Sequence, residues 1–184
     1  DGRVIRTPSV VSRDLSADAA LQGSFRLSDK LIHIRARDIE FVAAKLNRLG
    51  EAGSPDPLDG HLDMDHLGVL GYSFGGGAAA QTCWMDKRFK AGIDMDGAMF
   101  GEVTDSGVEQ PFLFFDDGGG VPQDDFKSSN PVKRRYAGTE KRDFDVERKV
   151  LEHGGYRVRI RGSEHSNFTD TALFSPVRYL NGTG

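Results

Sequence analysis

The chain has 184 residues, of which 38% are hydrophobic and 28% charged, and its formal net charge is −4. This length suits one globular domain with a sizeable core, and no apolar run approaches the roughly 18 residues that predict a membrane span. Lys and Arg are mixed with Asp and Glu rather than gathered in a stripe, which argues against nucleic acid as a partner.

The N-terminal third predicts a loop followed by one helix. Residues 1–27 are polar without a sustained period, so we expect a loop with a short hairpin near Arg3-Val4-Ile5. Ser28-Asp29 then offers an N-cap and an acid in the first turn. Apolar residues follow at helical spacing, and Gly50 stands where a glycine commonly ends a helix. The apolar residues are Ile32, Ala36, Ile39, Ala43 and Leu46.

The remainder alternates between strand-like and helix-like segments. We expect a loop at 51–63, strands at 67–71, 91–95, 111–115 and 156–160, helices at about 76–84 and 140–153, and irregular structure at 118–139. Strands that alternate with helices predict an α/β fold with a parallel sheet.

Residues 71–75 read Gly-Tyr-Ser-Phe-Gly, a G-x-S-x-G motif. An apolar run precedes it, and small residues that suit a helix start follow it. Strand, tight turn and helix form the context of a nucleophile elbow, which exposes the serine Oγ above the end of a sheet. Side chains at 71 and 75 are expected to collide there, and the serine backbone is expected at positive φ. The motif therefore predicts Ser73 as a nucleophile.

A serine hydroxyl needs a base within hydrogen-bond reach, and the base needs an acid that orients it. His165 lies in a loop just beyond the last predicted strand, where the base of an α/β-hydrolase can reach the elbow. We therefore expect His165 to be the base. The other histidines are His33 in the first helix, His61 and His66 before the nucleophile strand, and His153 at a helix C-terminus.

The acid has two candidate positions. Asp96 ends the strand that follows the elbow helix, and Asp116 and Asp117 end the next strand. Both positions lie at the carboxyl edge of a parallel sheet, where ligands and catalytic loops gather. The residues alone leave the choice between them open.

Several separated blocks resemble, in order and spacing, the plasma-type (isoform II) platelet-activating-factor acetylhydrolases. The resemblance covers about 35–116 and 155–170 and is weak over 1–27 and 117–150. The blocks are residues 37–42, 71–76, 81–82, 86–89, 92–96, 99–100 and 161–168.

The resemblance implies an α/β-hydrolase fold, a mostly parallel sheet with helices on both faces. It implies a calcium-independent serine esterase that cleaves short or oxidised acyl chains from phospholipids. The family's acid ends the strand after the elbow helix, which carries over to Asp96; Asp116 or Asp117 is then the fallback. Asp94, on the same strand face, is interpreted as a neighbour of the acid rather than a participant.

The oxyanion of an acyl-transfer intermediate usually receives two backbone N–H donors. Phe74, which follows the nucleophile, is expected to supply one, and a loop after an earlier strand the other. No segment before residue 73 suits that loop. We therefore expect residues 1–184 to be a single, partial α/β-hydrolase domain without its N-terminal strands and closing C-terminal helix. The missing strands would come from another segment or chain.

The leading hypothesis is a serine carboxylesterase or lipase that acts on a small-molecule or lipid ester, with peripheral contact to lipid. The alternative is a non-catalytic, hydrolase-like binding module, or an inactive fragment of a longer esterase. No cofactor is expected. No His, Cys or Asp cluster has the spacing of metal ligands, and the Gly118-Gly119-Gly120 tract lacks the Lys-Ser/Thr of a phosphate loop.

Overall fold

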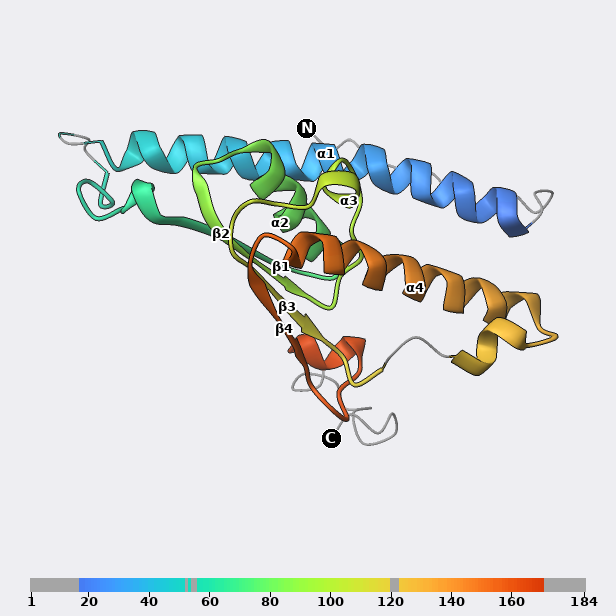
Figure 1. The fold of residues 1–184 in the computed structure, drawn as a ribbon. Helices are drawn as coiled ribbons and strands as arrows, with labels where there is room; N and C mark the ends of the chain where they lie inside the picture. Colours follow the sequence, from blue (N-terminus) through green and yellow to red (C-terminus); the bar gives the residue numbers. More distant parts are fainter. Residues whose placement is uncertain (1–16, 52, 54–55, 120–122, 171–184) are drawn as a thin grey trace.

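The computed structural model describes residues 17–51, 53, 56–119 and 123–170. Helices and strands alternate along the chain (Figure 1). The elements are α1 (Ala17–Leu49), β1 (Leu67–Tyr72), α2 (Phe74–Met85), β2 (Phe89–Met95), α3 (Val103–Ser106), β3 (Phe112–Asp116), α4 (Pro131–Leu151) and β4 (Gly155–Arg159), with 3-10 turns at Met64–His66, Gln123–Lys127 and His165–Phe168.

The four strands form one parallel sheet in the order β1-β2-β3-β4, as the alternating pattern predicts. Its register aligns Gly71 with Asp94, Asp94 with Phe114, and Phe114 with Arg157. Because all strands run the same way, their carboxyl ends meet at one edge. Ser73, Asp96 and Asp116 therefore come together there.

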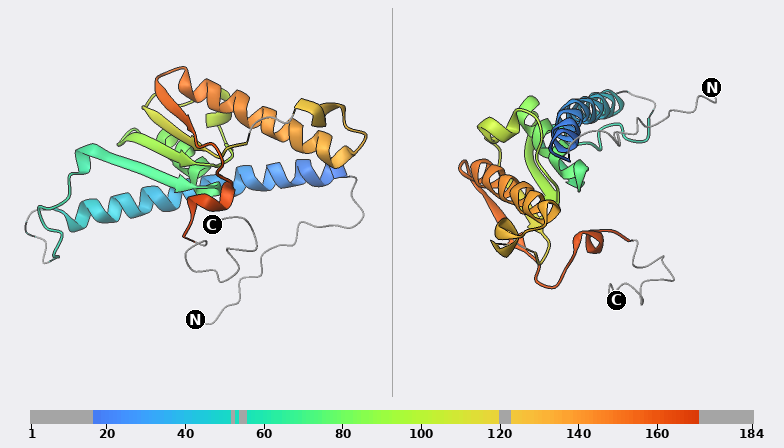
Figure 2. Two further views of the ribbon diagram at one scale, coloured as in Figure 1. Left: turned by 90° about the horizontal axis from the view of Figure 1, so that it is seen from below. Right: turned by 90° about the vertical axis from the view of Figure 1, so that its right-hand side faces the viewer.

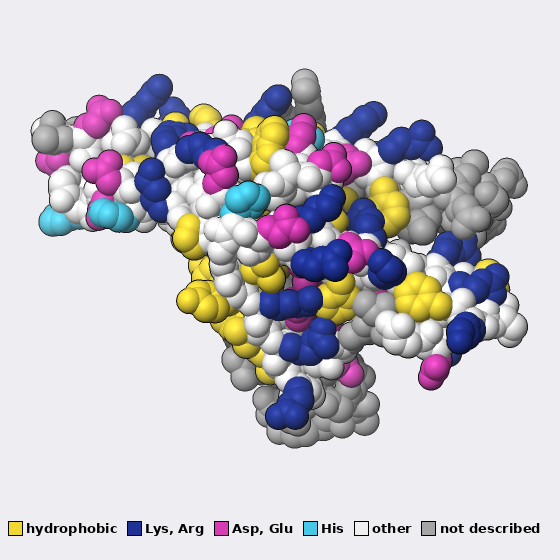
Figure 3. Space-filling model, in the orientation of Figure 1, with side chains coloured by type: hydrophobic (Ala, Val, Ile, Leu, Met, Phe, Trp, Pro, Cys, Tyr) yellow, Lys and Arg dark blue, Asp and Glu magenta, His cyan; other side chains and the backbone are white. Residues whose placement is uncertain are grey.

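The core lies on one face of this sheet. Phe112 and Phe114 of β3 point into it and are almost wholly buried, and α1, α2 and α4 contribute to the same cluster. Leu70, Tyr156 and Val158 lie on the opposite face and are exposed. Figure 3 shows hydrophobic side chains along the edge of the molecule beside β4. The described helices thus cover one face of the sheet. The layer of helices expected on the opposite face stays a prediction.

Helix α1 is longer than the pattern suggested. The expected loop up to residue 27 is wrong from Ala17 onward, because the helix runs through Ser28-Asp29 without a break. Asp29 acts as a tertiary anchor rather than a first-turn acid, since its Oδ1 accepts the Gly101 backbone N–H at 3.1 Å. The ring of Phe25 packs 6.2 Å from that of Phe100. The expected hairpin at residues 3–5 lies outside the described residues.

With 33 residues, α1 extends well past the sheet at its N-terminal end (Figure 2). Its buried face still follows the predicted spacing, with Ile32, Ala36 and Ala43 in the core. In the described part of the chain, neither α1 nor any other helix has the length and hydropathy that crossing a membrane requires.

Helix α4 begins nine residues earlier than residue 140, the expected start. Pro131 is its first residue, a position that proline favours because its fixed φ suits a helix start and its missing N–H needs no acceptor there. The basic cluster Lys133-Arg134-Arg135 consequently lies on the first turns of a helix, not in a loop. The earlier start matters for the site, because Tyr136 of the added turns lines the cavity that also borders Ser73 and Asp96.

We predict that Phe114→Ala destabilises the folded protein by about 3–5 kcal/mol, because it leaves a cavity in the core beside the sheet. Phe41→Ala is the matched control. Phe41 is 62% exposed on α1, so its truncation should change stability by less than about 0.5 kcal/mol. Urea denaturation of both variants provides the measurement. Equal losses would contradict the assigned core.

Candidate active site

Ser73 lies between the end of β1 and the first turn of α2, in a strained backbone conformation with φ 57° and ψ −127°. Its N–H donates to the Met95 carbonyl of β2 at 2.9 Å, and its carbonyl accepts the Gly76 N–H at 2.9 Å. Among the described residues other than glycine, only Ser73 and Asp96 have positive φ. The geometry is that of a nucleophile elbow, as the motif predicts.

The steric reason for the motif's glycines holds at one position only. A β-carbon on Gly71 would overlap the Gly75 carbonyl oxygen, so only glycine fits there. A β-carbon on Gly75 would meet no described atom within 4 Å, so the expected collision at 75 is wrong. The crowded positions around the elbow are Gly76 and Gly97 instead; a β-carbon on Gly97 would overlap the Ser73 carbonyl oxygen.

His165 begins the 3-10 turn that follows β4, and its Nε2 lies 3.1 Å from Ser73 Oγ. Its ring lies against that of Tyr72, with centroids 4.7 Å apart and planes tilted by 32°. His33 and His66 bind acidic residues elsewhere, Glu102 at 2.8 Å and Asp63 at 2.7 Å. The structure thus brings His165 to the elbow serine. Tyr72 was missed by sequence reasoning, although it is the residue directly before the nucleophile.

Asp96 completes a hydrogen-bonded chain with His165. The Nδ1 of His165 lies 2.6 Å from Asp96 Oδ2, and Asp96 Oδ1 accepts the Asp117 backbone N–H at 2.9 Å. Asp96 is held at the sheet edge because its own N–H donates to the Phe115 carbonyl at 2.7 Å. Only 15% of its side chain is exposed. Asp116 instead pairs with Arg157, and the Asp117 carboxylate accepts the Gly119 N–H.

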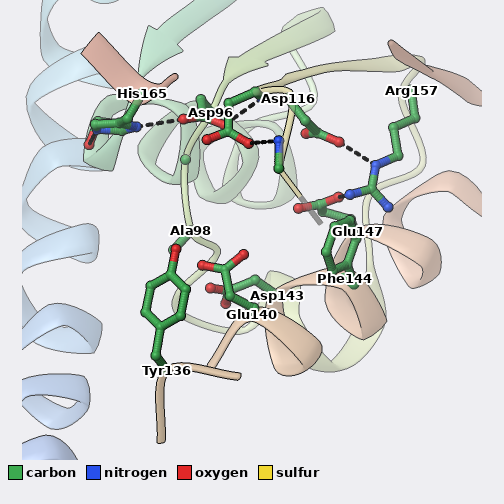
Figure 4. Close-up of a pocket in the computed structure, with 14 residues that line it drawn as sticks. Asp96, Ala98, Asp116, Tyr136, Glu140, Asp143, Phe144, Glu147, Arg157 and His165 are labelled. Carbon is green, nitrogen blue, oxygen red and sulfur yellow. Dashed lines mark hydrogen bonds and ion pairs between the residues drawn. The ribbon is translucent and has the colours of Figure 1, made fainter. Parts of the chain in front are cut away.

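A cavity of about 340 Å³ opens beside Ser73 and His165, between the strand ends and α4 (Figure 4). Arg157 of β4 bridges Asp116 and Glu147 along one wall. Burial and the Asp116 carboxylate raise the pKa of Glu147 to about 8, although Arg157 works against this shift. The α4 side of the cavity carries Tyr136, Glu140, Asp143, Phe144 and Glu147.

Burial also raises the pKa values of Glu140 and Asp143. Sequence reasoning missed this acidic lining, although its acids fall within the helix expected at 140–153; only Tyr136 lies in the stretch that was expected to be irregular. Helical spacing from residue 136 onward could have revealed it, since positions 136, 140, 143 and 147 share one helical face.

Phe74 is the first residue of α2, and its ring packs against that of Phe100, with the two ring centroids 5.7 Å apart. The N–H groups of a helix's first turn lack acceptors within the helix, so the Phe74 N–H suits an oxyanion. Its role and the source of a second donor stay predictions. In the described residues, no group of three or more His, Cys, Asp or Glu is arranged to hold a metal ion.

A parallel sheet with helices and a serine elbow at its carboxyl edge defines an α/β-hydrolase fold. A solved structure of the ferulic acid esterase from Streptomyces cinnamoneus is similar, with a TM-score of 0.54 and 26% sequence identity. The match covers 79% of this chain and 36% of that one.

The family model described as platelet-activating factor acetylhydrolase, isoform II, matches residues 33–180. The chain belongs to this family. The platelet-activating factor acetylhydrolase of Bos taurus is 33% identical over 137 residues, which cover 72% of this chain and 27% of that protein. The protein of the same name from Cavia porcellus is 33% identical over 117 residues, which cover 61% of this chain and 23% of that protein. The chain thus spans about a quarter of the length of these relatives.

We predict that Gly71→Ala lowers the rate at which a fluorophosphonate labels the protein by more than about tenfold, because the β-carbon forces the strand away from the elbow. Gly75→Ala should keep the rate within about twofold, since its β-carbon meets open space in the described residues. Labelling rates at matched protein concentration test this pair. Similar losses at both glycines would contradict the elbow packing.

Proposed function

We propose that the full-length protein is a serine carboxylesterase that hydrolyses short acyl esters through Ser73, His165 and Asp96. One observation carries the proposal. Ser73 Oγ, the two imidazole nitrogens of His165 and the Asp96 carboxylate form a continuous chain with separations of 3.1 and 2.6 Å. These residues come from three different strand ends, and the chain order Ser, Asp, His is that of α/β-hydrolases.

In this mechanism the neutral His165 carries its proton on Nδ1, and this N–H donates a hydrogen bond to the Asp96 carboxylate. Ser73 Oγ attacks the acyl carbonyl carbon while His165 Nε2 takes its proton, and Asp96 stabilises the resulting imidazolium. His165 then returns the proton to the leaving alkoxide oxygen, leaving an acyl group on Ser73. Water, deprotonated by His165, then attacks the acyl carbonyl carbon; as the bond to Ser73 Oγ breaks, His165 returns the proton to this oxygen and the carboxylic acid leaves.

The tetrahedral intermediates place a negative charge on the former carbonyl oxygen. We assign one stabilising donor to the Phe74 N–H, at the positive end of the α2 dipole. Loss of one such donor typically costs about 2.7–4 kcal/mol of barrier, so full activity requires a second donor, which we assign to the loop after an earlier strand.

The proposed substrate is an ester with a short acyl group, and specifically an acetyl ester of a lipid. The names of the relatives support this class, since the matched proteins are acetylhydrolases. Tyr136 of α4 lines the cavity and is 59% exposed. Its phenol ring offers an amphipathic surface to a lipid.

We predict that Ser73→Ala lowers hydrolysis of p-nitrophenyl acetate on the order of 10⁶-fold and abolishes fluorophosphonate labelling. Ser24→Ala, at an exposed position of α1, is the matched control and should behave as the wild type. If the wild-type protein neither turns over the ester nor becomes labelled, the protein is a non-catalytic binding module instead.

Replacing Asp96 and Asp117 in turn tests which of the two is the acid that orients His165. We predict that Asp96→Asn lowers the rate by about 10⁴-fold, because the amide no longer accepts the His165 Nδ1–H. Asp117→Asn should lose less than about tenfold, since its backbone N–H, not its carboxylate, contacts Asp96. Initial rates of both variants at pH 7.5 provide the measurement. The reverse order of losses would move the acid to Asp117.

A further inference from the structure

Asp94 is a buried acid that the proposed mechanism does not use. It lies on β2, two residues before Asp96, and is 1% exposed. Neither of its carboxyl oxygens has a hydrogen bond of normal geometry to a described group. A carboxyl group buried without such bonds is costly, so its presence beside the proposed nucleophile calls for a reason.

The packing around Asp94 joins the two halves of the site. A β-carbon on Gly76, in the first turn of α2, would overlap Asp94 Oδ1. A β-carbon on Gly97, directly after the proposed acid, would lie 2.5 Å from the same oxygen and would also overlap the Ser73 carbonyl. One carboxyl oxygen thus fills the space that both glycines leave open.

The charges that face Asp94 are mostly negative. Burial raises the pKa of Asp94 to about 8; the Asp116 and Asp96 carboxylates add to this rise, and the Gly97 backbone N–H opposes it. From α4, Asp143 acts in the same direction, and Glu147 also interacts with Asp94. The cations that pair with these acids are Arg157, which contacts Asp116 and Glu147, and Arg142, which contacts Asp143. The first turn of α2 and the adjacent part of β1 bring no titratable group against Asp94.

We propose that Asp94 is a positioning residue, whose carboxyl packs between the first turn of α2 and the Asp96–Gly97 turn and keeps Ser73 and Asp96 at their working separation. This inference rests on the proposed function. At neutral pH the carboxyl is protonated and packs as an uncharged group. Loss of that proton to solvent would place a second buried anion beside Asp96 and drive the turn away from the elbow. Asp94 thereby sets the alkaline limit of the activity.

The first test compares pH profiles of ester hydrolysis by the full-length protein, corrected for the enzyme-free rate. The rate of ester hydrolysis by the wild type should fall about 30-fold between pH 7 and 9.5, because a single group with a pKa of about 8 is nearly fully ionised at the higher pH. The rate of the Asp94→Asn variant should fall by less than about threefold over the same range. Glu147→Gln, which removes another buried acid with a pKa of about 8, should keep the alkaline fall.

The second test is thermal unfolding from pH 4 to 9. Since the pKa of Asp94 is higher in the folded state than its ordinary 3.8, its destabilising effect accumulates as the pH rises from about 4 to about 8 and is constant above. The melting temperature of Asp94→Asn minus that of the wild type should therefore increase across this window and then level off. A difference that is independent of pH would overturn the assignment of an uncharged, buried Asp94.

The third test uses a compensating pair. Gly76→Ala alone should slow fluorophosphonate labelling by at least about tenfold, and Gly76→Ala combined with Asp94→Ala should recover most of this loss. The double variant needs only a small shift of the two residues relative to each other, because the β-carbon kept at position 94 would lie 3.1 Å from the methyl group added at position 76. No recovery, or an Asp94→Asn profile that superimposes on the wild type, would overturn the inference. An active Ser73→Ala variant would instead contradict the proposed function.

Discussion

The site depends on hydrogen-bond ladders that continue one residue beyond the strands of a parallel sheet. The Ser73 N–H donates to Met95, the Asp96 N–H to Phe115, and the Ile160 N–H to Asp116. Each bond fixes the first residue after one strand against the last residues of a neighbouring strand. Because the strands are parallel, these residues meet at one edge, and the loop after Ile160 brings His165 Nε2 to 3.1 Å from Ser73 Oγ.

The features that sequence predicts well here are those with a local physical signature. The elbow combines an apolar strand, a serine and small residues within one turn, so its position follows from sterics and pattern. The four strands are short apolar runs bounded by turn residues, and their alternation with helices leaves a parallel sheet as the natural arrangement. The choice of Asp96 over Asp116 needed the family resemblance, because both end neighbouring strands.

The errors arose where tertiary contacts override local signals. Ser28-Asp29 has the chemistry of a helix start, yet Asp29 binds the Gly101 N–H and the helix continues through it. Pro131 marked the start of α4, but the Gly- and Ser-containing stretch around it favoured irregular structure. The contact of Asp94 with the elbow was beyond reach, since it depends on how closely α2 approaches β2. Such closeness is a property of the packed molecule rather than of any window of sequence.

The backbone at Ser73 and Asp96 has a consequence for how variants of this protein would accumulate. Both residues hold positive φ, which costs an L-amino acid with a side chain on the order of 1 kcal/mol and a glycine very little. Replacement of either by glycine relieves this strain while removing a side chain of the proposed triad. Selection for thermal stability alone would therefore favour glycine at both positions, and only a function such as the proposed chemistry would oppose that replacement.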